Sequence, residues 1–192
     1  MTIGIIADTH IPDRVNEIHP ELLSIFRAAG VRRILHAGDI SAAWVLTELA
    51  QVAPVTAVRG NRDFFSGRLK LVEQLDLGGV SVALMHGHGG LAPYLKDKVQ
   101  YYLEGYRLER YLDPLVRAAG PARVVIFGHT HRPGILHYKG KLIINPGSAT
   151  FGPLPGDLPT LGLLHITASG EVRPEIVLLR GWEIRERKWV KS

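Results

Sequence analysis

The sequence contains no cysteine, and this absence removes several kinds of chemistry at once. Without thiols there is no disulfide framework, no thiolate zinc cluster and no cysteine nucleophile. A bound transition metal would have to use His, Asp, Glu or Asn as its ligands. Any metal site in this protein should therefore consist of oxygen and imidazole ligands.

Long apolar runs are also missing at the start of the chain. It begins MTIGIIADTH and reaches Asp8 before a long hydrophobic segment can develop. We therefore expect neither a signal peptide nor a transmembrane helix. The expected location is cytoplasmic, and no membrane partner is expected.

The chain has no segment in which charges of one sign are concentrated. Lys and Arg number 23 against 18 acids, which gives a net charge of +5, but they are scattered except in the tail WEIRERKWVKS, where both signs occur. No specific nucleic-acid partner is implied. A small positive excess suits an anionic substrate, although solubility alone also explains it.

The first half of the chain alternates strand and helix patterns. Apolar runs at residues 2–7, 33–37 and 55–58 predict buried strands. Between them, HPELLSIFRAAG and SAAWVLTELAQ have the apolar spacing of helices, the first ending at Gly30 and the second beginning with Ser41 as a candidate N-cap. This order predicts an α/β fold.

The second half adds strand patterns with fewer helices between them. These patterns occupy residues 80–85, 123–127, 141–145, 162–166 and 172–179. The last three have no helix of any length between them, which indicates more antiparallel pairing. We therefore expect two mixed sheets packed face to face with helices outside, in a single domain that spans residues 1–192.

Residues 91–119 stand apart as a helical insertion, expected to be a hairpin or two helices broken near Gly105. The apolar spacing of Leu95, Val99 and Tyr102 favours packing of an amphipathic helix against the core. A homo-oligomer contact and stacking on a nucleobase are the alternatives. The insertion holds five of the six tyrosines: Tyr94, Tyr101, Tyr102, Tyr106 and Tyr111.

Side chains that bind metals follow five of the predicted strands. Taken singly, a strand-end Asp usually caps a turn and a lone His is usually a satisfied polar residue. Five strand ends that each offer a ligand atom indicate a metal centre instead, because this edge of an α/β sheet is where ligands bind. Glycines at 38, 60, 87 and 128 permit tight turns beside them. The candidates are Asp8, His10, Asp39, Asn61, His86, His129 and His131.

Seven ligands are too many for one tetrahedral zinc ion. A mixed carboxylate, imidazole and amide set suits Mn, Fe, Ni, Co or Zn, and we predict two divalent metal ions per chain with manganese as the first choice. A carboxylate can bridge two cations about 3.5–4 Å apart, and Asp39 is the candidate bridge. A hydroxide held between the cations would then be the nucleophile that attacks a phosphoester.

In chain order the motifs read D-T-H, G-D-I, G-N-R-D, M-H-G-H and G-H-T-H. This set resembles the calcineurin-like metallophosphoesterase superfamily, and DTHIPDR, LHAGD and INPGSAT resemble its small bacterial and archaeal phosphodiesterase branch over roughly residues 1–180. The resemblance implies a four-layer α/β/β/α sandwich. It also implies a metal-dependent phosphoesterase, with a small-molecule phosphodiester or nucleotide as the substrate.

The resemblance further divides the ligands between the two ions, with Asp39 shared. One ion would take Asp8, His10, Asp39 and His131. The other would take Asp39, Asn61, His86 and His129.

One position departs from the pattern of larger relatives, which carry Gly-Asn-His followed by an acid. Here that His is replaced by Arg62, which can bind phosphate oxygens but cannot act as a general acid because it stays protonated. Asp63 keeps the acidic place. We therefore expect a preference for diesters or activated leaving groups, with Asp39, Asn61 and Arg62 as catalytic side chains. His88 is the candidate donor of the missing proton, and a supporting or solvated role is its alternative.

Other polar residues carry weaker signals. Asn145, Gly147 and Ser148 resemble the family's segment beside the metal pocket, where a hydroxyl or amide can meet phosphate. A plain turn at Pro146-Gly147 explains them equally well. His36 falls within the second strand pattern and is expected to point into the interior. No role is assigned to His19, His137 and His165.

Three functions are consistent with this sequence pattern. Hydrolysis of a phosphodiester accounts for all seven candidate ligands. A protein-binding scaffold on the same fold is the alternative from another class, because a retromer subunit resembles this family and opens with Asp-Leu-His-Ile-Pro, although its ligands are altered. A phosphomonoesterase or pyrophosphatase differs only in the leaving group and in the shape of the pocket.

Overall fold

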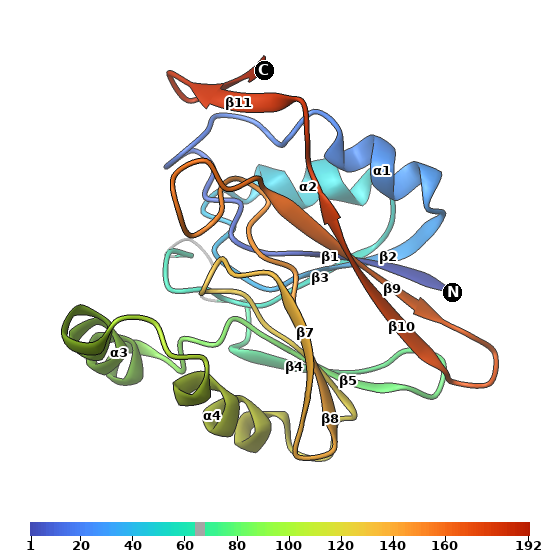
Figure 1. The fold of residues 1–192 in the computed structure, drawn as a ribbon. Helices are drawn as coiled ribbons and strands as arrows, with labels where there is room; N and C mark the ends of the chain where they lie inside the picture. The colour runs from blue at the N-terminus through green and yellow to red at the C-terminus, as the bar shows by residue number, and fades with distance from the viewer. Residues whose placement is uncertain (64–67) are drawn as a thin grey trace.

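The computed structural model describes residues 1–63 and 68–192, with the side chains of residues 91–94 and 96–98 excepted. Two five-stranded sheets pack face to face, with helices on both outer faces (Figure 1). The predicted α/β fold, a four-layer sandwich of two mixed sheets, is confirmed. No helix among the described residues is both long enough and apolar enough to cross a bilayer.

The first sheet has the strand order β10-β9-β1-β2-β3. Strand β1 pairs parallel with β2, and β2 with β3, while β9 is antiparallel to both β1 and β10. The parallel connections run through α1 (Leu22–Ala28) and α2 (Trp44–Ala50) on one face. The strands are β1 (Thr2–Ile6), β2 (Val31–His36), β3 (Val55–Ala57), β9 (Thr160–Ile166) and β10 (Val172–Leu178).

The second sheet has the order β4-β5-β6-β8-β7. Its three central strands are parallel, and the edge strands β4 and β7 are antiparallel to their neighbours. Helices α3 (Leu91–Glu104) and α4 (Glu109–Ala119) connect β5 to β6. The strands are β4 (Val72–Asp76), β5 (Ser81–Met85), β6 (Val124–Ile126), β7 (Gly134–Tyr138) and β8 (Lys141–Asn145).

Three apolar clusters correspond to the three interfaces between layers. Alternation along β1 sends Ile3 and Ile5 into the cluster between the sheets and Ile6 into the cluster under α1 and α2. The third cluster packs α4 on the second sheet through Leu112 and Leu115. Burial on both faces explains why these strands read as continuous apolar runs.

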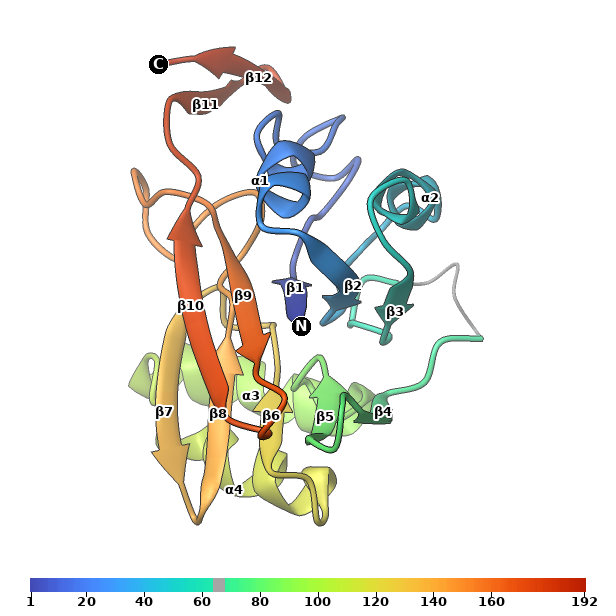
Figure 2. The ribbon, with the colours of Figure 1, turned by 90° about the vertical axis from the view of Figure 1, so that its right-hand side faces the viewer.

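A short hairpin near the C-terminus, β11 (Trp182–Arg185) and β12 (Lys188–Lys191), lies over the α1 side of the molecule (Figure 2). The Trp189 ring packs edge-on against His19 at 4.5 Å between centroids. Its indole N–H donates to the carbonyl of Glu17 over 3.1 Å. His19 is thereby accounted for as a packing residue.

Several sequence expectations need correction. The expected antiparallel character of the second half is only partly right, because β8 runs parallel to β6. Strands β4, β7 and the β11–β12 hairpin were not predicted, because their half-exposed apolar residues alternate with polar ones. Ser41 is not an N-cap: α2 begins at Trp44 without a side-chain cap, and the Ser41 amide instead donates to Asp63.

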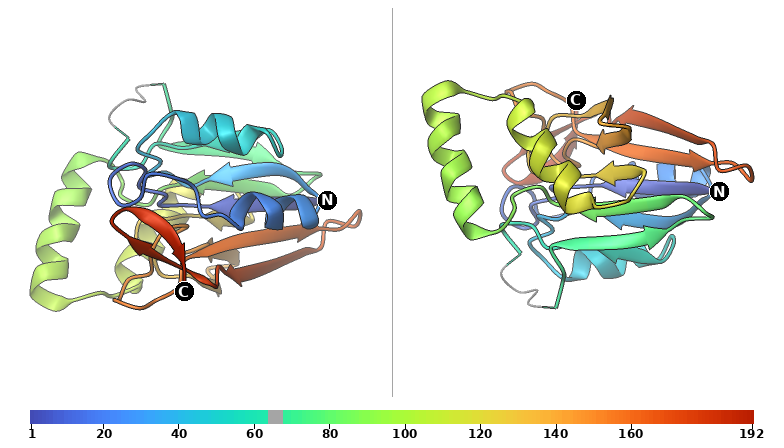
Figure 3. Two further views of the ribbon diagram at one scale, coloured as in Figure 1. Left: turned by 90° about the horizontal axis from the view of Figure 1, so that it is seen from above. Right: turned by 90° about the horizontal axis from the view of Figure 1, so that it is seen from below.

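The expectation that α3 packs against the core is wrong. The break at Gly105 occurs as predicted, with a positive φ of 73°. However, Leu95, Val99 and Tyr102 are 55%, 60% and 89% exposed. Figure 3 shows α3 standing away from the body while α4 lies along the sheet. Helical periodicity shows that a helix has an apolar face, but it does not identify what that face meets.

Candidate metal centre

The structure brings all seven predicted ligand candidates to one edge of the two sheets. The first sheet delivers Asp8 and His10 after β1, Asp39 after β2 and Asn61 after β3. The second sheet delivers the other three. His86 follows β5, and the two histidines of GHTH follow β6. Because all five strands are parallel within their sheets, their carboxyl ends coincide at this edge.

Three imidazole nitrogens surround one oxygen of Asp8. The Nε2 atoms of His131, His10 and His86 lie 3.4, 3.7 and 4.0 Å from Asp8 Oδ1. The Nε2 atoms of His10 and His131 are 3.1 Å apart. Asp39 adds its Oδ2 at 3.8 Å from His10 Nε2. Several atoms with lone pairs thus converge on a small volume, as they do around a cation.

A second group of atoms meets at Asn61. Its Oδ1 lies 3.0 Å from His86 Nε2 and 3.1 Å from His129 Nδ1. The other oxygen of Asp39, Oδ1, lies 3.5 Å from the same His86 nitrogen. Asp39 therefore faces His10 with one oxygen and His86 with the other.

His86 lies between a backbone carbonyl and the side chain of Asn61. Burial lowers its pKa well below the ordinary value, so the imidazole is neutral and carries one proton. Its two nitrogens contact the carbonyl of Ala37 at 2.7 Å and Asn61 Oδ1 at 3.0 Å. Because the Ala37 carbonyl can only accept, the single proton lies on Nδ1, and Nε2 keeps a lone pair directed toward Asn61, as a metal-ligating histidine requires. The donor set fits divalent metal ions.

The two carboxylates differ in charge when no metal is bound. Burial, together with the charge of Asp8, raises the pKa of Asp39 to about 8. Burial alone would raise the pKa of Asp8 as well, but His131, His86 and His10 bring it far below its usual range. In the metal-free protein at neutral pH, Asp8 therefore carries the charge and Asp39 the proton.

The backbone is strained at most of these positions. Five of the seven candidates have a positive φ, which is rare for residues other than glycine and costs about 1–3 kcal/mol each. They are Asp8 (54°), His10 (49°), Asp39 (54°), His129 (68°) and His131 (56°). Such strain persists only where surrounding contacts determine the conformation.

Asp63 supplies many of those contacts, a role that the sequence did not reveal. Its buried carboxylate accepts hydrogen bonds from the amides of Asp39 (3.0 Å), Ile40 (2.8 Å), Ser41 (2.8 Å) and Gly60 (2.7 Å). Asp63 thus holds the loop after β2 against the loop after β3. The only sequence signal is an acid two residues after Asn61, and such a residue is too common to be diagnostic.

Glycine is required where the loops touch. A Cβ atom on Gly60 would lie 2.2 Å from both the amide nitrogen and the Oδ1 of Asp39. A Cβ atom on Gly128 would lie 2.8 Å from Asp8 Oδ2, which accepts the His129 amide at 2.9 Å. Glycine at these two positions therefore permits the close approach of candidate ligand side chains to the backbone.

Two arginines border the site. A cavity of about 190 Å³ is lined by five of the seven candidate ligands, all except Asp8 and His86, together with Arg14, Arg62 and Phe151. Arg62 is partly exposed and pairs with Asp13 at 3.1 Å, while the Arg14 guanidinium lies over the Phe151 ring at 5.4 Å. Both guanidinium groups are therefore placed to contact an anion that enters this cavity.

His88 is poorly placed for the proposed proton donation. It does not line the cavity, and its ring centroid lies 5.2 Å from that of His86. Burial and the neighbouring His129 lower its pKa to about 4, so it holds no acidic proton at neutral pH. The supporting role is the better interpretation of His88 in this structure.

The remaining polar candidates hold the backbone. The Ser148 hydroxyl is buried and donates to the carbonyl of Asp8 at 2.7 Å, and Asn145 donates to the carbonyl of Gly128 at 3.0 Å. Neither residue lines the cavity, so the plain turn is the better of the two interpretations of this segment. His36 is buried, as predicted, and its Nε2 lies 3.2 Å from Thr9 Oγ1.

Replacing Asp63 should destabilise the protein even without metal. In Asp63→Ala four amides, three of them buried, lose their acceptor, and at about 1 kcal/mol or more each the free energy of unfolding should fall by about 3–5 kcal/mol. Urea denaturation of metal-free protein measures this. Asp63→Asn, which retains one acceptor oxygen, should lose less. A loss below about 1 kcal/mol in Asp63→Ala would contradict the assigned role.

Known proteins share this fold and sequence pattern. A 39% identical probable metallophosphoesterase of Methanothermobacter thermautotrophicus aligns over 78% of this chain and 78% of its own. A phosphodiesterase of Methanocaldococcus jannaschii is 32% identical, over 93% of this chain and 99% of its own. The crystal structure of Vps29 from Entamoeba histolytica complexed with Zn²⁺ has a TM-score of 0.64 and 27% identity, covering 94% of this chain and all of that one.

The sequence model of the calcineurin-like phosphoesterase superfamily domain matches residues 1–169. That span contains every strand and loop that delivers a candidate ligand. The chain therefore belongs to the calcineurin-like phosphoesterase superfamily.

Proposed function

We propose that this chain is a metal-dependent phosphodiesterase with two divalent cations. The observation that carries the proposal is the convergence of two buried carboxylates with three imidazoles, in which Asp8 Oδ1 is buried with no hydrogen-bond partner among the described residues and a cation would supply one. The similarity to a phosphodiesterase of M. jannaschii over nearly the whole of both chains supports diester hydrolysis. The proposed ligands are Asp8, His10, Asp39, Asn61, His86, His129 and His131.

The geometry supports sharing of Asp39 between the two ions. One of its oxygens faces His10, in the group with Asp8 and His131, and the other faces His86, in the group with Asn61. When bound, the ions would activate a water molecule as the nucleophile and neutralise the phosphoryl oxygens. Manganese is our first choice of metal, and Vps29 with Zn²⁺ shows that a similar fold can take a borderline cation.

The chain's own residues would orient the phosphate and leave the departing group unaided. Arg62 and Arg14 line the cavity and can hold phosphoryl oxygens that do not face the metal ions. Neither arginine gives up a proton, and His88 lies outside the cavity lining. Substrates with good leaving groups should therefore react faster than alkyl monoesters. We continue to expect a single domain and a cytoplasmic location.

A protein-binding scaffold is the second candidate. The observation in its favour is the exposed apolar face of α3, where Tyr102 and Leu103 are 89% and 72% exposed. Neither Tyr102 nor Leu103 lines the cavity at the candidate metal centre, so partner binding and hydrolysis are compatible. This face is also where a homo-oligomer contact would form.

The affinity for Mn²⁺ should depend on pH. Because the Asp39 pKa is about 8 without metal, a cation must displace a proton below that pH, and the affinity should fall by about tenfold or more per pH unit as pH decreases from 8 to 6. His131, whose pKa is raised by Asp8 despite burial, should steepen the fall. Calorimetric titration in buffers of different ionisation enthalpy counts the released protons. A pH-independent affinity would contradict the assignment.

The direct test of function is turnover by metal-stripped protein. Bis(p-nitrophenyl) phosphate and p-nitrophenyl phosphate should be offered with Mn²⁺, Ni²⁺, Co²⁺, Zn²⁺ or Mg²⁺ added separately. We expect a borderline metal to restore diester hydrolysis in preference to monoester hydrolysis. In Asp39→Ala, loss of the shared carboxylate should lower turnover by at least about 100-fold, because several kcal/mol of charge stabilisation disappear.

The control for Asp39→Ala is Asp113→Ala, which removes an exposed carboxylate on α4 that pairs with Lys139. It should retain wild-type turnover. Full activity in Asp39→Ala would refute the shared-ligand mechanism. Two bound ions with no turnover on either ester would favour the scaffold.

A further inference from the structure

A second hollow, of about 300 Å³, adjoins the metal centre. Its walls include Tyr101, Tyr106 and Tyr111 from the 91–119 insertion, with Arg132 and Phe151 among the other lining residues. The volume lies at the lower end of the range for small-molecule sites. We infer that this hollow, the tyrosine pocket, is a subsite for a nucleobase. The inference rests on the proposed function and narrows its substrate class to nucleotide esters.

The tyrosine pocket is continuous with the metal cavity. His129, His131 and Phe151 line both hollows. The Phe151 ring lies 4.6 Å from His131 between centroids, and the Tyr111 ring lies 6.2 Å from His129. One small molecule could therefore place a phosphate at the metal centre and another of its groups in the tyrosine pocket.

The walls offer aromatic faces. Tyr106 and Tyr111 are stacked, with centroids 5.9 Å apart and ring planes at 24°. Tyr111 is buried and fixed in the α4 cluster, whereas Tyr106 is only half-buried and Tyr101 is 51% exposed. The exposed ring of Tyr101, which lines the pocket together with this stacked pair, suits the stacking of a planar base, and such stacking tolerates any base.

Polar groups accompany the rings. The Arg132 guanidinium lies 4.3 Å above the centre of the Tyr106 ring, which orients it while its N–H groups remain able to donate to base or sugar oxygens. Thr130 also lines the pocket, and its hydroxyl accepts a hydrogen bond from Asn145 at 3.0 Å. Apolar walls with a few oriented polar groups are typical of small-molecule sites.

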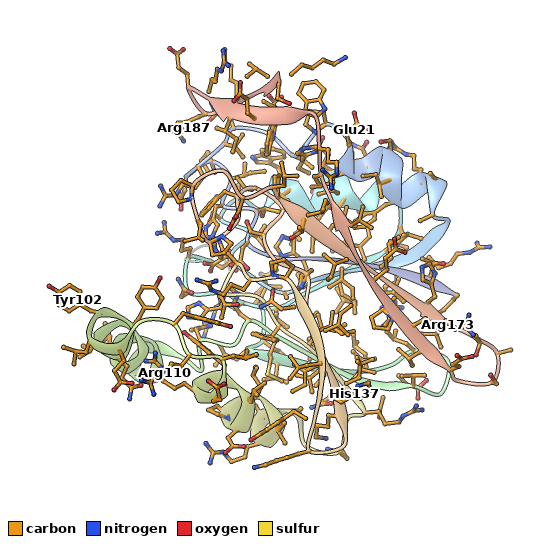
Figure 4. The ribbon with its side chains drawn as sticks, viewed as in Figure 1. Glu21, Tyr102, Arg110, His137, Arg173 and Arg187 are labelled. Atoms are coloured by element: carbon orange, nitrogen blue, oxygen red, sulfur yellow. The ribbon has the colours of Figure 1, made fainter. Side chains whose placement is uncertain are left out.

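Core packing alone does not account for all the tyrosines. Tyr111 fills that role, but Tyr101 lines the pocket from a helix whose described apolar side chains Leu95 and Val99 face solvent. Its neighbour Tyr102 is 89% exposed, does not line the pocket and points away from the body (Figure 4). Tyr101 and Tyr102 therefore form a matched pair for testing the pocket.

The test compares AMP with ribose 5-phosphate, which share the sugar and phosphate and differ by the base. Binding to Mn²⁺-loaded protein is measured by calorimetry, which needs no turnover. We expect AMP to bind about tenfold more tightly or better, from one stacked base. Tyr101→Ala should reduce this ratio several-fold, whereas Tyr102→Ala should leave it unchanged. Tyr106→Phe should retain most of it, because the ring is kept.

Equal affinity for the two compounds in the wild-type protein would overturn the nucleobase subsite and leave the proposed hydrolysis intact. An equal loss of the ratio in Tyr101→Ala and Tyr102→Ala would also overturn it, because only one of these residues lines the pocket. Failure to bind either compound, with Mn²⁺ bound, would count against both the subsite and the proposed function.

Discussion

The apolar interface between the two sheets is the contact on which the site depends. Ile3, Ile5 and Leu35 of the first sheet pack against residues such as Leu84 and Ile126 of the second. This packing places the carboxyl ends of three strands of one sheet beside those of two strands of the other. Neither sheet alone contains a full set of ligands for one ion, since Asp8 and Asp39 come from the first and His86 from the second.

Hydrogen bonds then adjust the position of the loops within this frame. The His129 amide donates to Asp8 across the sheets, and the Asp63 carboxylate gathers amides from the loops after β2 and β3. These bonds oppose the cost of the left-handed backbone at the candidate ligands. The protein thereby stores strain at the site, and the gain from binding cations would offset part of it. We therefore expect residues outside the candidate ligand set, Asp63 above all, to influence both stability and metal affinity.

Much of the fold and the site could be predicted from the sequence because both depend on local patterns. Buried parallel strands appear as apolar runs, and each candidate ligand directly follows such a run. The role of Asp63 could not be predicted, because it depends on four amides from residues 39–41 and 60 that meet only after folding. The position of α3 could not be predicted either, since Leu95 and Val99 have helical spacing yet face outward.

The central claim is that seven side chains from two sheets hold a pair of cations. The most direct measurement is the number of Mn²⁺ ions per chain in purified, Mn²⁺-loaded protein, together with its electron paramagnetic resonance spectrum. We predict two ions per chain whose spins are coupled, as expected for cations about 3.5–4 Å apart. A single ion per chain, or two ions with the spectrum of isolated Mn²⁺, would contradict the shared role of Asp39.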